Sequence, residues 1–200
     1  MHTIKKMLSF ALMKVVITYK DMKSCAFRAT ITHAGDLHVT APTWATRDMV
    51  NDFLLQNKEK IKQGAERMQR SYEHRRRFFA QLSLNTPQQR REATRRLDAI
   101  VRELVMHYTQ LMGVNPPAAV TYRANTSRWG SCNHKTRRLS FSLYLLLLPH
   151  ECIEHVVVHE LTHLLVPNHS PAFHALMDKY FPRWREARRE TRLLCYGPHN

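Results

Sequence analysis

The segment His159-Glu160-Leu161-Thr162-His163 restricts what this chain can fold into more than any other feature. Residues four apart lie on one face of a helix, so a helical segment lets His159 and His163 direct imidazole nitrogens at a single ion. Glu160 is then placed to reach a water on that ion rather than the ion itself. The arrangement is typical of zinc hydrolases, in which this carboxylate is a general base.

The sequence around this motif favours the helix that the motif needs. Residues 152–166 contain no glycine or proline, and their apolar side chains recur at helical spacing. Pro149 precedes the segment and Pro167 follows it, so both ends of the helix are marked.

A third candidate ligand follows directly. Ser170 is a good N-cap and Pro171 suits a first helical position, so a second helix is expected to begin there. His169 would then lie in the turn between the two helices. Three protein ligands leave one tetrahedral position for water, as in a catalytic zinc site. The alternative is that these are surface or core histidines in a chain that has 13 of them.

Neighbouring side chains are expected to play lesser parts. His155 lies one turn before His159 but too far from His163 to share one ion, so it is interpreted as a packing residue or a support for a ligand. His174, on the second helix, would orient a ligand or face solvent. Glu151 and Glu154 are expected to favour the helix N-terminus electrostatically.

Cysteine content and hydropathy indicate a soluble, cytoplasmic protein. The four cysteines are scattered and include no C-x-x-C pair, which argues against a disulfide framework; Cys132 and Cys152 are expected to be buried thiols. The apolar run within the first 13 residues is too short for a membrane span, and it is read as a leader or the lead-in to a strand.

The net charge of +15 is concentrated in two stretches. Residues 58–102 carry thirteen Lys or Arg against five acids, and residues 183–192 carry five against two. Such segments attract phosphates, so a nucleic acid, a nucleotide or an anionic surface is a candidate partner. The equally weighted alternative is a set of solvated helix faces.

The remaining pattern predicts an α+β chain. A β-rich start ends in a hairpin around residues 34–36, and a helix from Thr46 to Arg77 follows, with Met49, Val50, Phe53 and Leu54 on its apolar face. Residues 81–89 form the best linker. Expected next are a helix over 90–112 closed by Gly113, strands at 119–123 and 139–143, and the motif helix. Two parts are predicted, 1–88 and 89–200, the second with a basic C-terminal helix.

Three ordered motifs resemble a known family. They are Arg128-Trp129-Gly130-Ser131-Cys132, residues 156–164 around the His-Glu motif, and residues 168–173 around His169. Together they resemble the YgjP-like metal-dependent hydrolases of the zincin (gluzincin-type) superfamily, over most of the chain. The resemblance implies a compact zincin-like core, zinc ligands at His159, His163 and His169, and a catalytic base at Glu160.

The resemblance implies two activities for one site. The family is catalogued as metallopeptidase-like, which implies a peptide or protein substrate, and a member is associated with nucleoside triphosphate pyrophosphatase activity on UTP. A third reading, a nucleic-acid-associated module with a structural metal, is disfavoured because a structural site is normally closed by four protein ligands. Nickel, manganese or cobalt are alternatives to zinc.

Substrate contacts are expected upstream of the motif helix. Arg128 is a candidate for binding an anionic group or a developing oxyanion, and its alternative reading is a surface arginine beside a packed Trp129. Gly130 is expected to permit close approach of the backbone, and Ser131 belongs to the same segment. Tyr122, Tyr144 and Tyr180 are candidates for a transition-state hydroxyl. The turn at residues 133–136 lacks the glycine expected from the resemblance.

Overall fold

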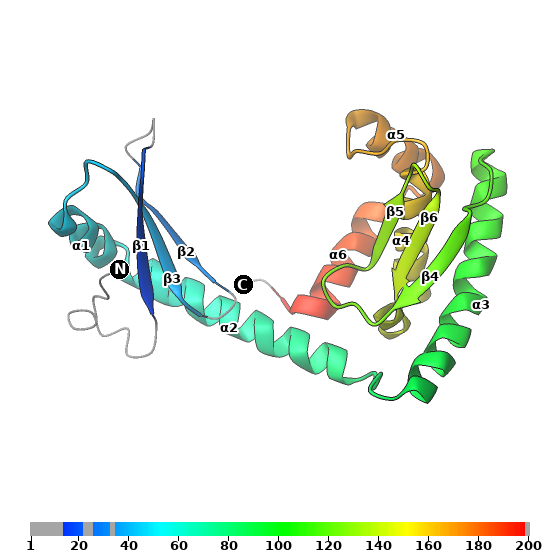
Figure 1. The fold of residues 1–200 in the computed structure, drawn as a ribbon, viewed down its shortest axis with the longest axis horizontal. Helices are drawn as coiled ribbons and strands as arrows, with labels where there is room; N and C mark the ends of the chain where they lie inside the picture. Colours follow the sequence, from blue (N-terminus) through cyan, green and yellow to red (C-terminus); the bar gives the residue numbers. More distant parts are fainter. Residues whose placement is uncertain (1–13, 22–25, 33–34, 199–200) are drawn as a thin grey trace. The chain divides into compact units, whose positions relative to one another are not determined.

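The computed structural model describes residues 14–21, 26–32 and 35–198. Within them the chain forms α-helices and two three-stranded sheets, an α+β fold as predicted (Figure 1). It divides into two compact units, Met1–His74 and Arg75–Pro198, which are treated separately below. The expected leader and Cys25 lie outside the described residues.

The first unit has a sheet in the order β1-β3-β2. β3 is parallel to β1 and antiparallel to β2, with Arg28 opposite Thr40, which confirms the expected hairpin. Leu37, Val39 and Ala41 alternate along β3 and are fully buried, so this central strand carries the core of the unit. The strands are β1 (Val15–Lys20), β2 (Arg28–Ile31) and β3 (Leu37–Pro42).

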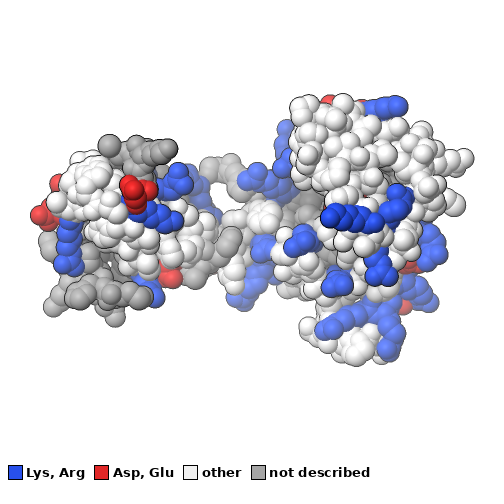
Figure 2. All heavy atoms as spheres, turned by 45° about the horizontal axis from the view of Figure 1, so that its top comes forward, with Lys and Arg blue, Asp and Glu red and all other residues white. Residues whose placement is uncertain are grey.

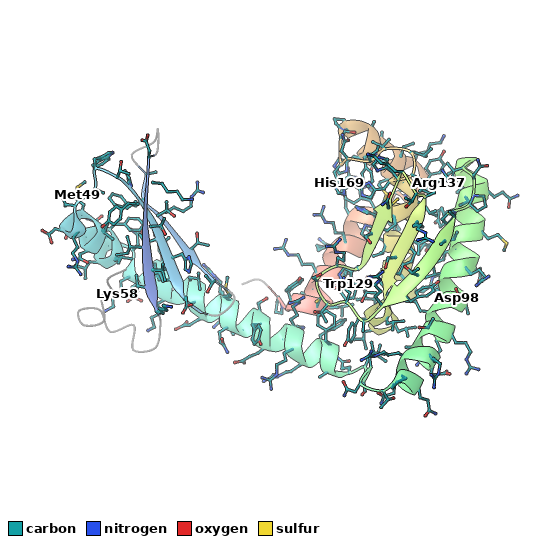
Figure 3. The ribbon with its side chains drawn as sticks, viewed as in Figure 1. Met49, Lys58, Asp98, Trp129, Arg137 and His169 are labelled. Atoms are coloured by element: carbon teal, nitrogen blue, oxygen red, sulfur yellow. The ribbon has the colours of Figure 1, made fainter. Side chains whose placement is uncertain are left out.

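The single helix predicted from Thr46 to Arg77 is wrong, because two helices occupy this stretch: α1 (Arg47–Gln56) and α2 (Lys58–Ala80). Asn57 separates them, and its side-chain amide donates to the carbonyl of Phe53 at 2.8 Å. Such local bonding by asparagine competes with the helical ladder. Thr46 caps α1 as predicted. Of the expected apolar face, Val50 and Leu54 are buried but Met49 is exposed (Figure 3).

The second unit contains the end of α2, followed by a long helix that is capped at both ends, α3 (Pro87–Met112). Thr86 and Gln89 form a capping box, which starts the helix three residues before the predicted position. Gly113 ends it in the left-handed conformation with φ of 66°, which confirms the expected C-cap.

A second sheet, in the order β4-β6-β5, follows α3. β6 (Arg138–Ser142) lies between β4 (Ala119–Arg123), to which it is parallel, and β5 (Gly130–Asn133), to which it is antiparallel. The missing glycine in the β5–β6 turn is explained by Arg137, which takes a positive φ of 51°. Its guanidinium donates to the carbonyl oxygens of Asn115 and Pro116 and so offsets the strain.

The remaining elements are η1 (Leu143–Leu147), α4 (His150–Thr162), α5 (Pro171–Tyr180) and α6 (Trp184–Tyr196). The 3₁₀ helix η1 was not predicted. α4 packs against α3, α5, α6 and β5, so it lies at the centre of this unit (Figure 1). The helix ends at Thr162, four residues before the predicted limit, although the amide of His163 still donates to the carbonyl of His159 at 3.3 Å.

Charge, cysteines and hydropathy can be compared with expectation. Lys and Arg side chains outnumber acidic ones on the face drawn in Figure 2. Cys152 is buried as predicted, whereas Cys132 is half-buried. None of the helices in the described part of the chain has both the length and the apolar character needed to cross a membrane.

Candidate metal centre and active site

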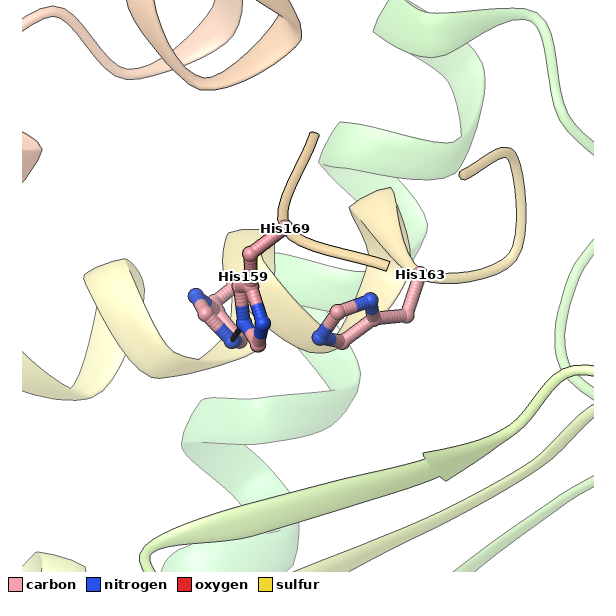
Figure 4. Close-up of side chains that lie close together, drawn as sticks. All are labelled: His159, His163 and His169. Atoms are coloured by element: carbon pink, nitrogen blue, oxygen red, sulfur yellow. Dashed lines mark hydrogen bonds between the residues drawn. The ribbon is translucent and has the colours of Figure 1, made fainter. Parts of the chain in front are cut away.

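Three imidazoles come together at the end of α4 (Figure 4). His159 is on the helix, His163 is its C-cap residue, and His169 is in the connection to α5. The Nε2 atoms of His159 and His169 are 3.0 Å apart, and one potential ligand nitrogen from each ring lies within 4.8 Å of the others. The structure therefore assembles the three histidines selected from the sequence.

The tautomer of His163 is fixed by the backbone. Its Nδ1 lies 3.1 Å from the carbonyl oxygen of Val166. A carbonyl oxygen only accepts, so Nδ1 carries the proton and the Nε2 lone pair is free. Hydrogen bonding of this kind orients metal-ligating histidines.

His169 is held by the turn that starts α5. The side-chain oxygen of Asn168 accepts from the amide of Ser170 at 3.2 Å, which closes a tight local turn around His169. Ser170 is the N-cap and Pro171 the first helical residue, as predicted, but the Ser170 side chain makes no capping hydrogen bond.

Phe173 forms a common support for all three imidazoles. Its ring centroid is 4.9 Å from that of His159, 4.7 Å from that of His163 and 4.8 Å from that of His169. The side chain is 1% exposed, so packing fixes its position. The arrangement of the imidazoles thus depends on the hydrophobic core of α5.

The donor set fits a divalent metal ion. Burial, followed by the neighbouring charges, lowers the pKa of His159 to about 3, and burial also lowers the pKa of His163. Both rings are therefore neutral at pH 7, the form that binds metals. Two nitrogens on a tetrahedral zinc ion are roughly 3.4 Å apart, close to the 3.0 Å separation of the two Nε2 atoms.

Glu160 is buried next to this cluster. Its side chain is 6% exposed, and desolvation raises its pKa from 4.5 to about 8, while the charge of Arg128 acts in the opposite direction. Perturbation by burial together with a specific charge is typical of functional carboxylates.

Gly130 lies directly against this carboxylate. A β-carbon at this position would be 2.6 Å from Oε1 of Glu160 and 2.7 Å from its Cγ. Real β-carbons do not approach other atoms so closely, so any side chain at this position would force Glu160 to move. The expected close approach of the backbone is confirmed, and the atom approached is the Glu160 carboxylate.

We expect Gly130→Ala to reduce turnover at least 100-fold, because the added methyl group displaces Glu160 from its position by about 1 Å. Metal content, measured after dialysis, should be unchanged, because the added methyl group would meet atoms of Glu160 and none of the imidazoles. The matched control is Gly64→Ala, whose added methyl meets only the flexible end of Ile31 at 3.1 Å. Equal activity of the two variants would contradict the role of Gly130.

A pH-dependent stability follows from burial of Glu160. The unfolded carboxyl ionises near pH 4.5, whereas in the folded, metal-free protein burial raises its pKa to about 8. Its stabilising contribution is complete below pH 4.5 and is lost as the pH rises to about 8. Between about pH 5 and pH 7 the metal-free wild type should lose about 3 kcal/mol relative to Glu160→Gln. Urea unfolding with chelator tests this; parallel stability curves for the two proteins would refute it.

A cavity of about 500 Å³ opens onto the cluster. His159, Glu160 and His169 contribute to its wall, together with Trp129 and Gly130. Of the four predicted substrate residues, Trp129 and Gly130 therefore line the cavity. Arg128 and Ser131 are not among its lining residues in the described part of the chain, although the charge of Arg128 acts on Glu160.

Much of the opposite wall comes from α6, which was predicted only as a basic helix. Trp184, Arg188, Arg192 and Tyr196 all line the cavity. Their spacing at positions 184, 188, 192 and 196 places them on one helix face. This stripe was visible in the sequence, but nothing in the sequence showed that it faces the histidines.

The other candidates lie elsewhere or have other partners. The Tyr122 hydroxyl donates to Asp98 at 3.1 Å, and Tyr144 packs edge-on against Phe79. Tyr180 is not among the cavity residues described, and its ring lies under the Lys179 ammonium group. Glu154 accepts from Tyr108 at 2.7 Å and Glu151 pairs with Arg183 at 2.8 Å.

Comparisons with known proteins show the family to which the chain belongs. Residues 80–193 match the YgjP-like family, whose description is "YgjP-like, metallopeptidase domain". A solved structure, the metallopeptidase zymogen abylysin of Pyrococcus abyssi, is 27% identical over 46% of this chain and 94% of its own, with a TM-score of 0.42. A search of curated proteins found no significant match. Because the family match spans more than half of the chain, the protein belongs to the YgjP-like family of metallopeptidase-domain, metal-dependent hydrolases.

Proposed function

We propose that the protein is a zinc-dependent peptidase in which His159, His163 and His169 hold the metal and Glu160 is the general base. The observation that carries the proposal is the convergence of three imidazoles beside a buried carboxylate at one cavity. Imidazole ligands suit zinc, and three of them leave a coordination position for water, as catalytic rather than structural zinc sites do.

His159, His163 and His169 would hold the zinc ion, which would supply the Lewis acidity that makes water more acidic and polarises a carbonyl oxygen. Glu160 accepts a proton from the attacking water as the new carbon–oxygen bond forms. It then donates that proton to the leaving amine as the carbon–nitrogen bond breaks. Gly130 keeps the carboxylate in place, because its lack of a side chain leaves room for Oε1.

Arg128 and the cavity wall are both suited to support this reaction. The guanidinium of Arg128 partly offsets the effect of burial on Glu160 and so raises the share of the ionised form, which is the form that can accept a proton. The cavity wall combines the aromatic side chains of Trp129, Phe173 and Trp184 with histidine, arginine and carboxylate groups, so both apolar surface and charged groups are available to position a substrate.

The position of β5 supports a peptide as substrate. β5 is an edge strand of the sheet, paired with β6 on one side only in the described part of the chain. Its first residue, Gly130, is in contact with Glu160. An extended peptide can add to a sheet edge through main-chain hydrogen bonds, which would bring its backbone to the carboxylate.

The experiment that tests the proposal compares both predicted substrate classes on zinc-loaded protein. We expect new amino termini from casein or short peptides, and none in the presence of a chelator or with Glu160→Gln. Pyrophosphate release from UTP without peptide cleavage would instead favour the nucleotide pyrophosphatase that uses the same residues. Failure of both substrates to react would contradict the catalytic assignment.

A further inference from the structure

His155 is a buried polar side chain without a partner. It is 7% exposed, and neither of its ring nitrogens has a hydrogen-bond partner among the described residues. Buried polar atoms in proteins are nearly always bonded, and an unbonded one costs free energy. His155 also lines the cavity at the metal centre. A ligand in the cavity could therefore supply the missing partner.

Arg188 lines the same cavity as His155. Burial lowers the pKa of His155 to about 4, and the positive charge of Arg188 acts in the same direction. Arg188 is exposed and forms no ion pair within the described part of the chain. Arg192, one turn further along α6, lines the same cavity. The carboxylate that lines the cavity, Glu160 of α4, is assigned to proton transfer and not to pairing with these arginines.

We propose that His155 and Arg188 form a subsite that binds a carboxylate of the substrate, next to the bond that is cleaved. This inference rests on the proposed peptidase function and specifies the class of substrate. A guanidinium fork matches a carboxylate, and one imidazole N–H provides a further donor. The carboxylate is either an acidic side chain or the free C-terminus of a peptide, since both present the same group.

The apolar part of the cavity wall suits the chain that carries such a carboxylate. Trp184 stacks on His174 with ring centroids 5.3 Å apart, and its indole N–H donates to Asp178 at 2.8 Å. The guanidinium of Arg185 lies 4.4 Å from the Trp184 ring centroid. Trp184 is thereby fixed in position, and the part of it that lines the cavity one turn before Arg188 can pack against the methylene groups of a substrate side chain.

The test is a binding measurement on the zinc-loaded Glu160→Gln protein, which should bind peptides without cleaving them. Fluorescent peptides differ only in Glu or Gln at one position and in a free or amidated C-terminus. We expect one of the two carboxylates to tighten binding about tenfold, and the peptide pair that shows this identifies its source. Arg188→Gln should abolish the preference, while the neighbouring Arg189→Gln, which does not line the cavity, should retain it.

Several outcomes would overturn the inference. Equal affinity for charged and neutral peptides, or equal loss in Arg188→Gln and Arg189→Gln, excludes a specific carboxylate subsite. Competition by inorganic phosphate more strongly than by acetate assigns the subsite to phosphates instead. If the wild type cleaves peptides without any preference, only the subsite is wrong. If no peptide is bound or cleaved, the proposed function fails with it.

A second variant separates the role of His155 from a purely structural one. His155→Phe fills the same volume without polar atoms and removes the unbonded nitrogens, so the fold should be retained, as circular dichroism would show. We expect KM for the preferred acidic peptide to rise several-fold while kcat changes little, since the residue touches the bound carboxylate rather than the reacting atoms. A change in kcat alone would refute the assignment.

Discussion

Replacing Glu160 by Gln should reduce kcat by about 10²–10⁴-fold while the protein still binds one metal ion. The amide has the shape of the carboxylate but cannot accept the proton of the attacking water. The three imidazoles should keep their positions, because Glu160 takes part in neither of the hydrogen bonds described for them. The loss should therefore appear in turnover and not in metal content.

Metal analysis after dialysis and initial rates with a cleaved peptide measure these two quantities on the same sample. Glu186→Gln is the matched control, because it removes a carboxylate that is on α6, is exposed and forms an ion pair with Arg183. We expect this control to keep wild-type turnover. A fully active Glu160→Gln protein would exclude Glu160 as the base, and a metal-free one would mean that the residue supports the site structurally.

The second large effect concerns the metal itself. His169→Ala should abolish stable zinc binding, since two imidazoles are left from the group of three whose ligand nitrogens lie within 4.8 Å of one another. At a zinc concentration of about 1,000 times Kd, the wild type should gain about 4 kcal/mol in unfolding free energy, and the variant almost none. Because His169 is exposed, the metal-free variant should be nearly as stable as the wild type.

Urea unfolding at increasing zinc concentration measures this difference, with His107→Ala as the control. His107 is an exposed histidine on α3 that packs against Tyr108 and is remote from the cluster in the sequence. The control should show the full zinc-dependent stabilisation. Equal stabilisation of His169→Ala and the wild type would show that the ion is held elsewhere.

The centre of the site could be predicted because its spacing and its helix coincide in the sequence. His159 and His163 are four residues apart in a stretch without helix breakers, and Pro171 marks the start of the next helix. These local signals fix the short connection that carries His169. The roles of the three histidines and Glu160 stay predictions until metal binding and activity are measured.

Elements that depend on a single side chain or on packing could not be predicted. The break between α1 and α2 lies at Asn57, whose side-chain amide donates to the carbonyl of Phe53. Asparagine bonds of this kind compete only weakly with the helical hydrogen bonds, so the sequence alone does not show that the helix breaks here. The left-handed backbone of Arg137 is tolerated because its own guanidinium bonds the chain at residues 115 and 116. The contribution of α6 to the cavity depends on tertiary contacts with α4.

The support of three imidazoles by Phe173 has a consequence for how the ion is acquired. A fully buried ring that contacts all three holds their relative orientation by packing, so the imidazoles lose their rotational freedom when the chain folds. Little conformational entropy is then lost when the ion arrives, which raises affinity without any additional ligand. On the proposed function, the histidine cluster would act as a rigid receptor for the metal, and substitutions at Phe173 should weaken metal binding from outside the coordination sphere.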